Sequence, residues 1–415
     1  MRAYGWAVAV VATAAVAALL VVVMAPPADQ LIEPAPARAS DYFSAAQIER
    51  GQDFRRPQVF IGLAALATQI ALLVWLVRRP PARLRRAGAR WWHGALAGAA
   101  IAVAQSVVVL PFTIVSRIRA IDVGLNTRSW PGWAWDWMLS VSINAVEMGL
   151  LAVALLWLMR RLPRWWWAPG TVVVVVIAVT WTLFSPVVLD PLFNRFETLR
   201  AEPLRSQVLQ LAREAGVDAS EVQIMDASRR TTGANAYVAG LGHTKRIVLY
   251  DNLLKDFTRP EQLNIVAHEL GHEHYNDVPR GLLYVAIVAP FGMLAVALLT
   301  RRLTPGTGPV VLPALALSIL LVTTGISWIS NSLSRQVEAR ADAFALRTTN
   351  EPDALIALQR RLVDRNVSDP DPPGWVTAVF GTHPPPMDRI GAALAERQLA
   401  LRPRAGCCDS PGRGN

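Results

Sequence analysis

Val266-Ala-His-Glu-Leu-Gly-His272 is the stretch around which this sequence is best interpreted. Its two histidines are four residues apart, so on an α-helix both imidazoles project from one face toward a single point. That geometry suits two ligands of one zinc ion, and Glu269 is placed to act on the water that such an ion holds. The chain has only 6 histidines, which makes a chance HExxH uncommon. The alternative is a helix that merely carries polar residues at helical spacing.

Long apolar segments lie on both sides of the motif. The chain is 53% hydrophobic and only 17% charged, with a mean hydropathy of +0.31, which excludes an ordinary soluble protein of 415 residues. A helix needs roughly 20 apolar residues to cross a bilayer. The segments that meet this length, seven in all, are Trp6–Met24, Val59–Val77, Ala95–Ile114, Met138–Met159, Thr171–Leu189, Leu282–Leu299 and Val310–Ile329. The first could be a signal peptide, but its apolar stretch is long and no clean cleavage site follows, so we favour a retained span.

The net charge of +10 is concentrated in short loops between the predicted spans. The loop arginines are Arg78, Arg79, Arg83, Arg85, Arg86, Arg90, Arg160, Arg161, Arg164, Arg301 and Arg302. They occupy alternate loops, which is typical of a topology signal rather than of nucleic-acid binding. The positive-inside rule makes that side cytoplasmic and places the HExxH region on the outer face of what we expect to be a bacterial plasma membrane. We therefore expect the lipid bilayer, and no nucleic acid, as a partner.

The hydrophilic sequence predicts a small α+β domain around the motif. Short strands are expected at Val222–Met225 and Arg246–Tyr250, on either side of an alternating stretch at Gly233–Gly240. Pro260 opens the helix Glu261–Asn276, which carries the motif. A second hydrophilic piece, Ser332–Leu399, reads as largely helical with proline-rich breaks. Before the second span, Phe43–Arg50 predicts a short surface helix.

These segments together predict a mainly α membrane protein with about seven transmembrane helices and a peptidase domain split by a transmembrane hairpin. The expected divisions are a membrane domain (1–190), the first peptidase part (191–279), the hairpin (280–330), the second peptidase part (331–400) and a disordered tail (401–415). The tail holds the only two cysteines, Cys407 and Cys408, whose spacing suits neither a disulfide framework nor a zinc site.

A hydrolytic zinc site usually has three protein ligands and one open position, so a third ligand is needed. Glu338 and Asp342 are four residues apart on a predicted helix and share one face. Glu338 can complete the coordination, while Asp342 accepts a hydrogen bond from the outer nitrogen of a ligating histidine. The alternative is a solvated helix face, which Arg335 and Arg340 would support. We expect one Zn²⁺ per chain, with Glu269 moving the proton of its water.

With these residues in place, the sequence resembles the CAAX prenyl protease 1 family, the Ste24-type integral membrane zinc metallopeptidases of family M48. The resemblance rests on several motifs in one order, and it covers most of the chain. After five spans come Pro191-Leu-Phe-Asn-Arg-Phe196, Asn235-Ala-Tyr237 with Gly240, Lys245-Arg-Ile-Val-Leu-Tyr-Asp251, the HExxH motif, a two-span hairpin, the Glu338/Asp342 pair and a His383…Arg389 segment.

The resemblance implies a gluzincin-like domain in which His268, His272 and Glu338 bind zinc and Glu269 is the base. It also implies that Asn235, Ala236 and Tyr237 lie on an edge strand that pairs with the substrate backbone. His383 and Arg389 would assist the oxyanion or the positioning of ligands. Peptide or protein substrates, including lipidated or membrane-bound ones, are then expected, either by CAAX-type cleavage or by quality control of membrane proteins.

The competing function is a non-catalytic seven-span binding or transport protein with a structural zinc site. A structural site has four protein ligands and needs no acid or base residue. Here Glu269 is present and no fourth ligand stands out in the sequence. Glu147 is the clear ionisable residue within a predicted span, which makes a transporter a poor alternative.

Overall fold

The computed structural model of this protein describes residues 4–88, 90–240 and 245–401, so the predicted tail and its two cysteines fall outside the described residues except for Leu401. Among these residues, seven helices are long and apolar enough to cross a membrane, which confirms the seven predicted spans. They are α1 (Gly5–Val23), α3 (Ala45–Arg78), α5 (Trp91–Asp122), α6 (Trp130–Arg161), α7 (Trp167–Phe184), α12 (Asp277–Leu303) and α13 (Leu312–Thr349). The α7 segment continues through a π-helical turn, Ser185–Leu189, into α8 (Asp190–Phe193).

The outward faces of these helices require lipid. In the most apolar window of the α7 segment, 0% of the residues are buried inside the protein, and for α1 the share is 17%. Helices that are apolar all round, with so little of that surface covered by protein, are stable only in a hydrocarbon environment. The membrane helices nevertheless share a core of their own, in which Leu73, Leu155 and Leu315 are almost fully buried.

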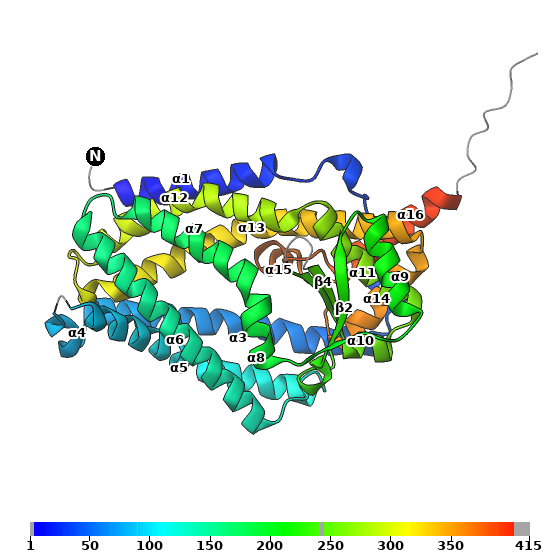
Figure 1. The fold of residues 1–415 in the computed structure, drawn as a ribbon, viewed down its shortest axis with the longest axis horizontal. Coiled ribbons are helices and arrows are strands. Elements are labelled where there is room, and N and C mark those ends of the chain that lie inside the picture. The colour runs from blue at the N-terminus through cyan, green and yellow to red at the C-terminus, as the bar shows by residue number, and fades with distance from the viewer. Residues whose placement is uncertain (1–3, 89, 241–244, 402–415) are drawn as a thin grey trace, which may run out of the picture.

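The arginine-rich loops gather at one end of the helices and the peptidase domain forms the other (Figure 1). Arg301 donates to the carbonyl of Pro163, and Arg160 Nε lies 3.4 Å from the carbonyl oxygen of Thr307. These contacts join two of the loops, and α4 (Ala82–Arg86), from the third, packs on the same turn near residue 309. The alternate loops therefore lie on one side, as the sequence predicted, and the HExxH helix lies at the opposite end.

A four-stranded sheet with the order β1-β2-β4-β3 forms one wall of the peptidase domain. Its strands are β1 (Phe196–Thr198), β2 (Ala219–Met225), β3 (Ala236–Ala239) and β4 (Lys245–Tyr250). β2 and β4 are parallel, while the two outer pairings are antiparallel. β3 is an edge strand. The sequence predicted three of these strands and missed β1, whose three residues are too few to show a period.

Helices cover the sheet and enclose a second core. They are α9 (Leu204–Glu214), α10 (Asp251–Asp256), α11 (Arg259–His274), α14 (Pro352–Arg365), α15 (Gly374–Phe380) and α16 (Pro386–Leu401). Ile247 and Leu249 of β4 are fully buried, together with Val266 and Leu270 of α11. Because consecutive apolar residues of β4 are covered on both faces, this strand fixes the position of α11.

One expectation about helix limits was wrong, and two expected domain boundaries fall inside helices. Phe43–Arg50 is not a separate surface helix: Ser44 caps the first turn of α3 through Gln47, and that helix runs unbroken to Arg78. The expected boundary between the hairpin and the second peptidase part, at residue 330, falls inside α13, and the boundary at 279 falls inside α12. Pro279 lies in the first turn of α12, where a proline is tolerated, and α13 runs unbroken through residue 330.

Candidate active site

The helix α11 presents the HExxH motif to a large cavity. It begins with a capping box, in which the Thr258 backbone N–H donates to Glu261 at 2.6 Å, and Pro260 occupies its first turn. The apolar face of the helix is buried against the sheet, so the opposite face is turned toward a cavity of about 920 Å³. His268 and Glu269 line that cavity.

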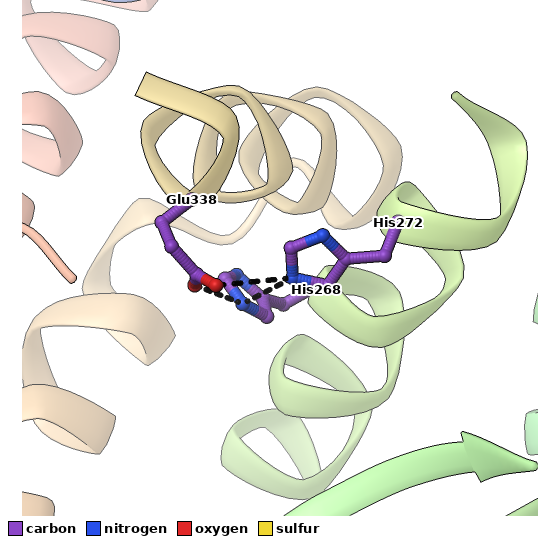
Figure 2. Close-up of side chains that lie close together, drawn as sticks. All are labelled: His268, His272 and Glu338. Atoms are coloured by element: carbon purple, nitrogen blue, oxygen red, sulfur yellow. Dashed lines mark hydrogen bonds and ion pairs between the residues drawn. The ribbon is translucent and has the colours of Figure 1, made fainter. Parts of the chain in front are cut away.

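Three side chains converge on one point, and one of them, His268, lines the cavity (Figure 2). His268 and His272 come from successive turns of α11, and Glu338 comes from α13, the continuation of the seventh span. One ligand atom from each residue lies within 4.8 Å of the others. The sequence thus placed together the three residues that the fold brings into contact.

The distances among these atoms fit a tetrahedral metal ion. Ligands about 2.0–2.1 Å from a tetrahedral zinc ion lie roughly 3.3 Å from each other. The Nε2 atoms of His268 and His272 are 3.3 Å apart, and Glu338 oxygens lie 3.2 Å and 3.6 Å from them. Oε2 of Glu338 is buried without a hydrogen-bond partner among the described residues. A cation at the centre would satisfy this oxygen and both imidazole lone pairs.

Carboxylates hold the outer nitrogen of each imidazole, and an arginine holds each carboxylate. Nδ1 of His268 lies 2.9 Å from Oδ1 of Asp342, which the sequence had predicted as its acceptor. Nε of Arg389 donates to the other oxygen of Asp342 at 2.7 Å, and Nη2 donates to Oδ1 at 2.5 Å. Both imidazoles therefore direct Nε2 at the centre of the site, since Nδ1 donates outward.

The equivalent partner of His272 was missed in the sequence. Nδ1 of His272 lies 3.0 Å from Oδ2 of Asp277, whose other oxygen accepts from the fully buried Arg340. Asn276 precedes it with φ of 54°, and this left-handed residue turns the chain between α11 and α12 so that Asp277 faces back toward α11. Asn-Asp directly after a helical HExxH was the available signal, because asparagine tolerates that conformation.

Comparison with known proteins agrees with this geometry. The profile of peptidase family M48 matches residues 198–397, and that of the CAAX prenyl protease N-terminal region, with five membrane helices, matches residues 29–195. The uncharacterized metalloprotease YhfN of Bacillus subtilis is 30% identical over 306 residues, which cover 71% of this chain and 72% of YhfN. The chain belongs to peptidase family M48.

Further relatives place this M48 peptidase with the Ste24-type members. A CAAX prenyl protease 1 homologue of Oryza sativa is 31% identical over 216 residues, about half of each chain (50% and 51%). The crystal structure of S. mikatae Ste24p shares the fold, with a TM-score of 0.71 at 20% identity over 94% of this chain and 98% of that one. The protein is therefore a multi-pass membrane metallopeptidase, and family membership implies a metal ion and a peptide or protein substrate.

Burial and hydrogen bonding adjust the acidity of the groups in this M48 peptidase. Burial alone would lower the pKa of His268, but its hydrogen bond to Asp342 and the close carboxylate of Glu338 raise it to about 10. Burial also raises the pKa of Glu269 above the ordinary carboxyl range, although the nearby imidazoles oppose this. The Arg389 guanidinium is desolvated, yet contact with Asp342 raises its pKa. Arg389 therefore stays charged and committed to that carboxylate.

His383 lies at the rim of the site, between α15 and α16. Its Nε2 atom is 3.4 Å from Oε2 of Glu338, and its Nδ1 atom is 3.0 Å from the hydroxyl of Thr382. The imidazole is largely exposed toward the cavity that it helps to line, and its pKa is lowered by partial burial despite the neighbouring Glu338. A neutral imidazole at this place can donate or accept a proton.

The edge strand β3 begins directly after Asn235, which lines the cavity. Tyr250 N–H donates to the Asn235 carbonyl at 3.1 Å, so these two residues form a hydrogen-bonded antiparallel pair. Pairs alternate in an antiparallel ladder, so the N–H and C=O groups of Ala236 and Val238 point away from β4, although Ala236 itself is buried. The Tyr237 hydroxyl instead donates to Asp190 at 3.0 Å and ties the sheet to the end of the fifth span.

Proposed function

We propose that this M48 peptidase is a zinc endopeptidase whose site is formed by His268, His272 and Glu338, with Glu269 as general base. The observation that carries the proposal is the convergence of the three ligand atoms within 4.8 Å of one another. Two imidazoles and one carboxylate are the donors of a catalytic zinc site, and three protein ligands leave one position open. A fourth protein ligand, which a structural zinc site would need, does not join this group in the described part of the chain.

Zinc held by these three residues would supply Lewis acidity, polarising the scissile carbonyl and lowering the pKa of a water molecule in the site. The carboxylate of Glu269 takes the proton from the attacking water and passes it to the leaving amine. Its raised pKa suits both steps, because a base poised nearer neutral pH is also an effective acid. His383 at the rim donates to the oxyanion as it develops.

Asp342 and Arg389 act as positioning residues in this proposal. Asp342 fixes the tautomer and the ring orientation of His268, and Arg389 holds Asp342 through two hydrogen bonds. Since the guanidinium makes these bonds, we assign Arg389 to ligand positioning rather than to the oxyanion. Asp277 has the corresponding role for His272.

The substrate is proposed to lie as an added strand along β3, at Asn235, Ala236 and Tyr237. Backbone pairing gives affinity without strict sequence demand. The backbone groups of the half-buried Val238, which point away from β4, support this arrangement, while the Tyr237 side chain serves to anchor the strand. Two substrate classes fit a site at the end of seven spans: the prenylated C-terminus of a CAAX protein, and a misfolded membrane protein.

The test is peptidase activity of the detergent-purified protein on unfolded casein and on a prenylated C-terminal peptide, with zinc content measured in parallel. Glu269→Gln should keep its zinc and lose roughly 10²–10⁴-fold in kcat. The matched control is Glu273→Gln, four residues on along α11, whose carboxylate pairs with Lys245 outside the site. Zinc bound to an inactive wild type would instead favour a membrane binding protein with a structural metal.

A further inference from the structure

Among the described aspartate and arginine side chains that line the catalytic cavity, Asp369 and Arg389 have a counter-charge and Arg55 does not. Asp369 lies 3.7 Å from Arg56, and Arg389 is bound to Asp342. Arg55 also lines the cavity, yet among the described residues it has no carboxylate within ion-pairing distance. Half-buried cations without a counter-charge are uncommon in proteins, because desolvation of an unpaired charge is costly.

Arg55 is held rigidly by one edge of its guanidinium. Its Nε donates to the carbonyl of Val367 at 2.9 Å, and its Nη2 donates to that of Asn366 at 2.5 Å. These carbonyls follow the end of α14, and Val367 has a φ of 47°, a conformation that β-branched residues rarely adopt. The strained turn thus directs both carbonyls at Arg55. Nη1 of Arg55 makes no hydrogen bond among the described residues and is not a buried atom. The second edge of the guanidinium group therefore remains open to the cavity.

The position of Arg55 corresponds to the C-terminal side of a bound peptide. A peptide added antiparallel to β3, as β4 is on the other side of that strand, runs its C-terminal residues past Asn235 toward Gly233. Gly233 lies directly against Asn366: a Cβ at that glycine would be 2.8 Å from Oδ1 of Asn366. Asn366 is one of the two residues that hold Arg55, so the peptide path leads to the open guanidinium edge.

We propose that Arg55 is a specificity-determining residue that binds a carboxylate of the peptide on the C-terminal side of the scissile bond. This inference rests on the proposed peptidase site. At the open edge of the guanidinium, two parallel N–H groups match the two oxygens of a carboxylate. The other edge is already fixed by its hydrogen bonds to the carbonyls of Val367 and Asn366. Two sources share this chemistry, the free C-terminus of the substrate and an acidic side chain near it.

The experiment uses the full-length protein in detergent and one short alanine- and leucine-rich fluorogenic peptide in three forms: a free C-terminal carboxylate, a C-terminal amide, and an amide preceded by glutamate. We expect the wild type to prefer the free carboxylate by about tenfold to a hundredfold in kcat/KM, mostly through KM. Arg55→Gln should remove this preference and leave cleavage of the plain amide nearly unchanged. If the wild type cleaves the glutamate peptide in preference to the plain amide, and Arg55→Gln does not, an acidic side chain can supply the carboxylate equally well.

The matched control is Arg50→Gln, one and a half turns earlier on α3, whose guanidinium pairs with Asp364 of α14 at 3.4 Å. It should retain the carboxylate preference. Binding of the same peptides to the Glu269→Gln variant, followed by fluorescence anisotropy, reports on Arg55 without any turnover, so failure of the peptidase assignment would show separately. The proposal would be contradicted if Arg55→Gln lowered kcat/KM equally for all three peptides, or if carboxylate and amide peptides bound equally well to the protein with Arg55 intact. Arg55 would then only stabilise the C-terminal end of α14.

Discussion

At the scale of single residues, each imidazole of the site depends on a carboxylate and an arginine outside it. We predict that Asp277→Asn weakens zinc binding by about tenfold to a hundredfold, because an amide oxygen replaces the charged acceptor of His272 Nδ1. Chelator competition on the purified protein measures this change. Asp353→Asn is the control, since that carboxylate pairs with Arg397 on the surface. Unchanged affinity in Asp277→Asn would show that the hydrogen bond to His272 does not tune the metal site.

The proton held by His268 makes metal binding depend on pH. With its pKa raised to about 10 in the metal-free site, the imidazole is protonated at neutral pH and must lose this proton to become a ligand. The apparent zinc affinity should therefore rise with pH up to that value, by about tenfold per unit for each proton displaced. Titration calorimetry in buffers of different ionisation enthalpy measures the protons released. Zinc uptake without proton release would contradict this assignment.

At the scale of elements, the close packing of helices α5 and α6 depends on a glycine at their contact. A Cβ at Gly98 would lie 2.6 Å from both the Met148 carbonyl and Ala152 Cβ, so the two helices pack backbone to backbone. We predict that Gly98→Leu forces them apart and lowers stability by about 1–3 kcal/mol. Thermal unfolding in detergent, followed by tryptophan fluorescence, checks this. Gly325→Leu on α13, where an added Cβ would meet no atom of the described residues within 4 Å, should leave the melting temperature close to the wild type.

The elements also show which features sequence reasoning can reach. Spans are determined by local length and apolarity, and the HExxH helix by its spacing and its opening Pro260, so these were predicted. Glu338 was found because a zinc site needs a third ligand, although it lies far along the chain. The partnership of Arg389 with Asp342 and that of Arg340 with Asp277 depend on how α11, α12, α13 and α16 meet in space. Nothing in the local sequence encodes those distances, and the rigid placement of Arg55 depends in the same way on the turn after α14.

At the scale of the whole molecule, the arginine loops and the peptidase domain lie at opposite ends, so one membrane orientation determines the location of both (Figure 1). The positive-inside rule predicts that the arginine end is cytoplasmic and the metal site is on the outer face. A fusion after Leu401, at the peptidase end, should then activate a reporter that folds only outside the cytoplasm. A fusion in the loop after Arg302 should activate only a cytoplasmic reporter, which controls for expression and insertion. Cytoplasmic activity from the Leu401 fusion would reverse the orientation and place proteolysis on the inner face, where substrates come directly from the cytosol.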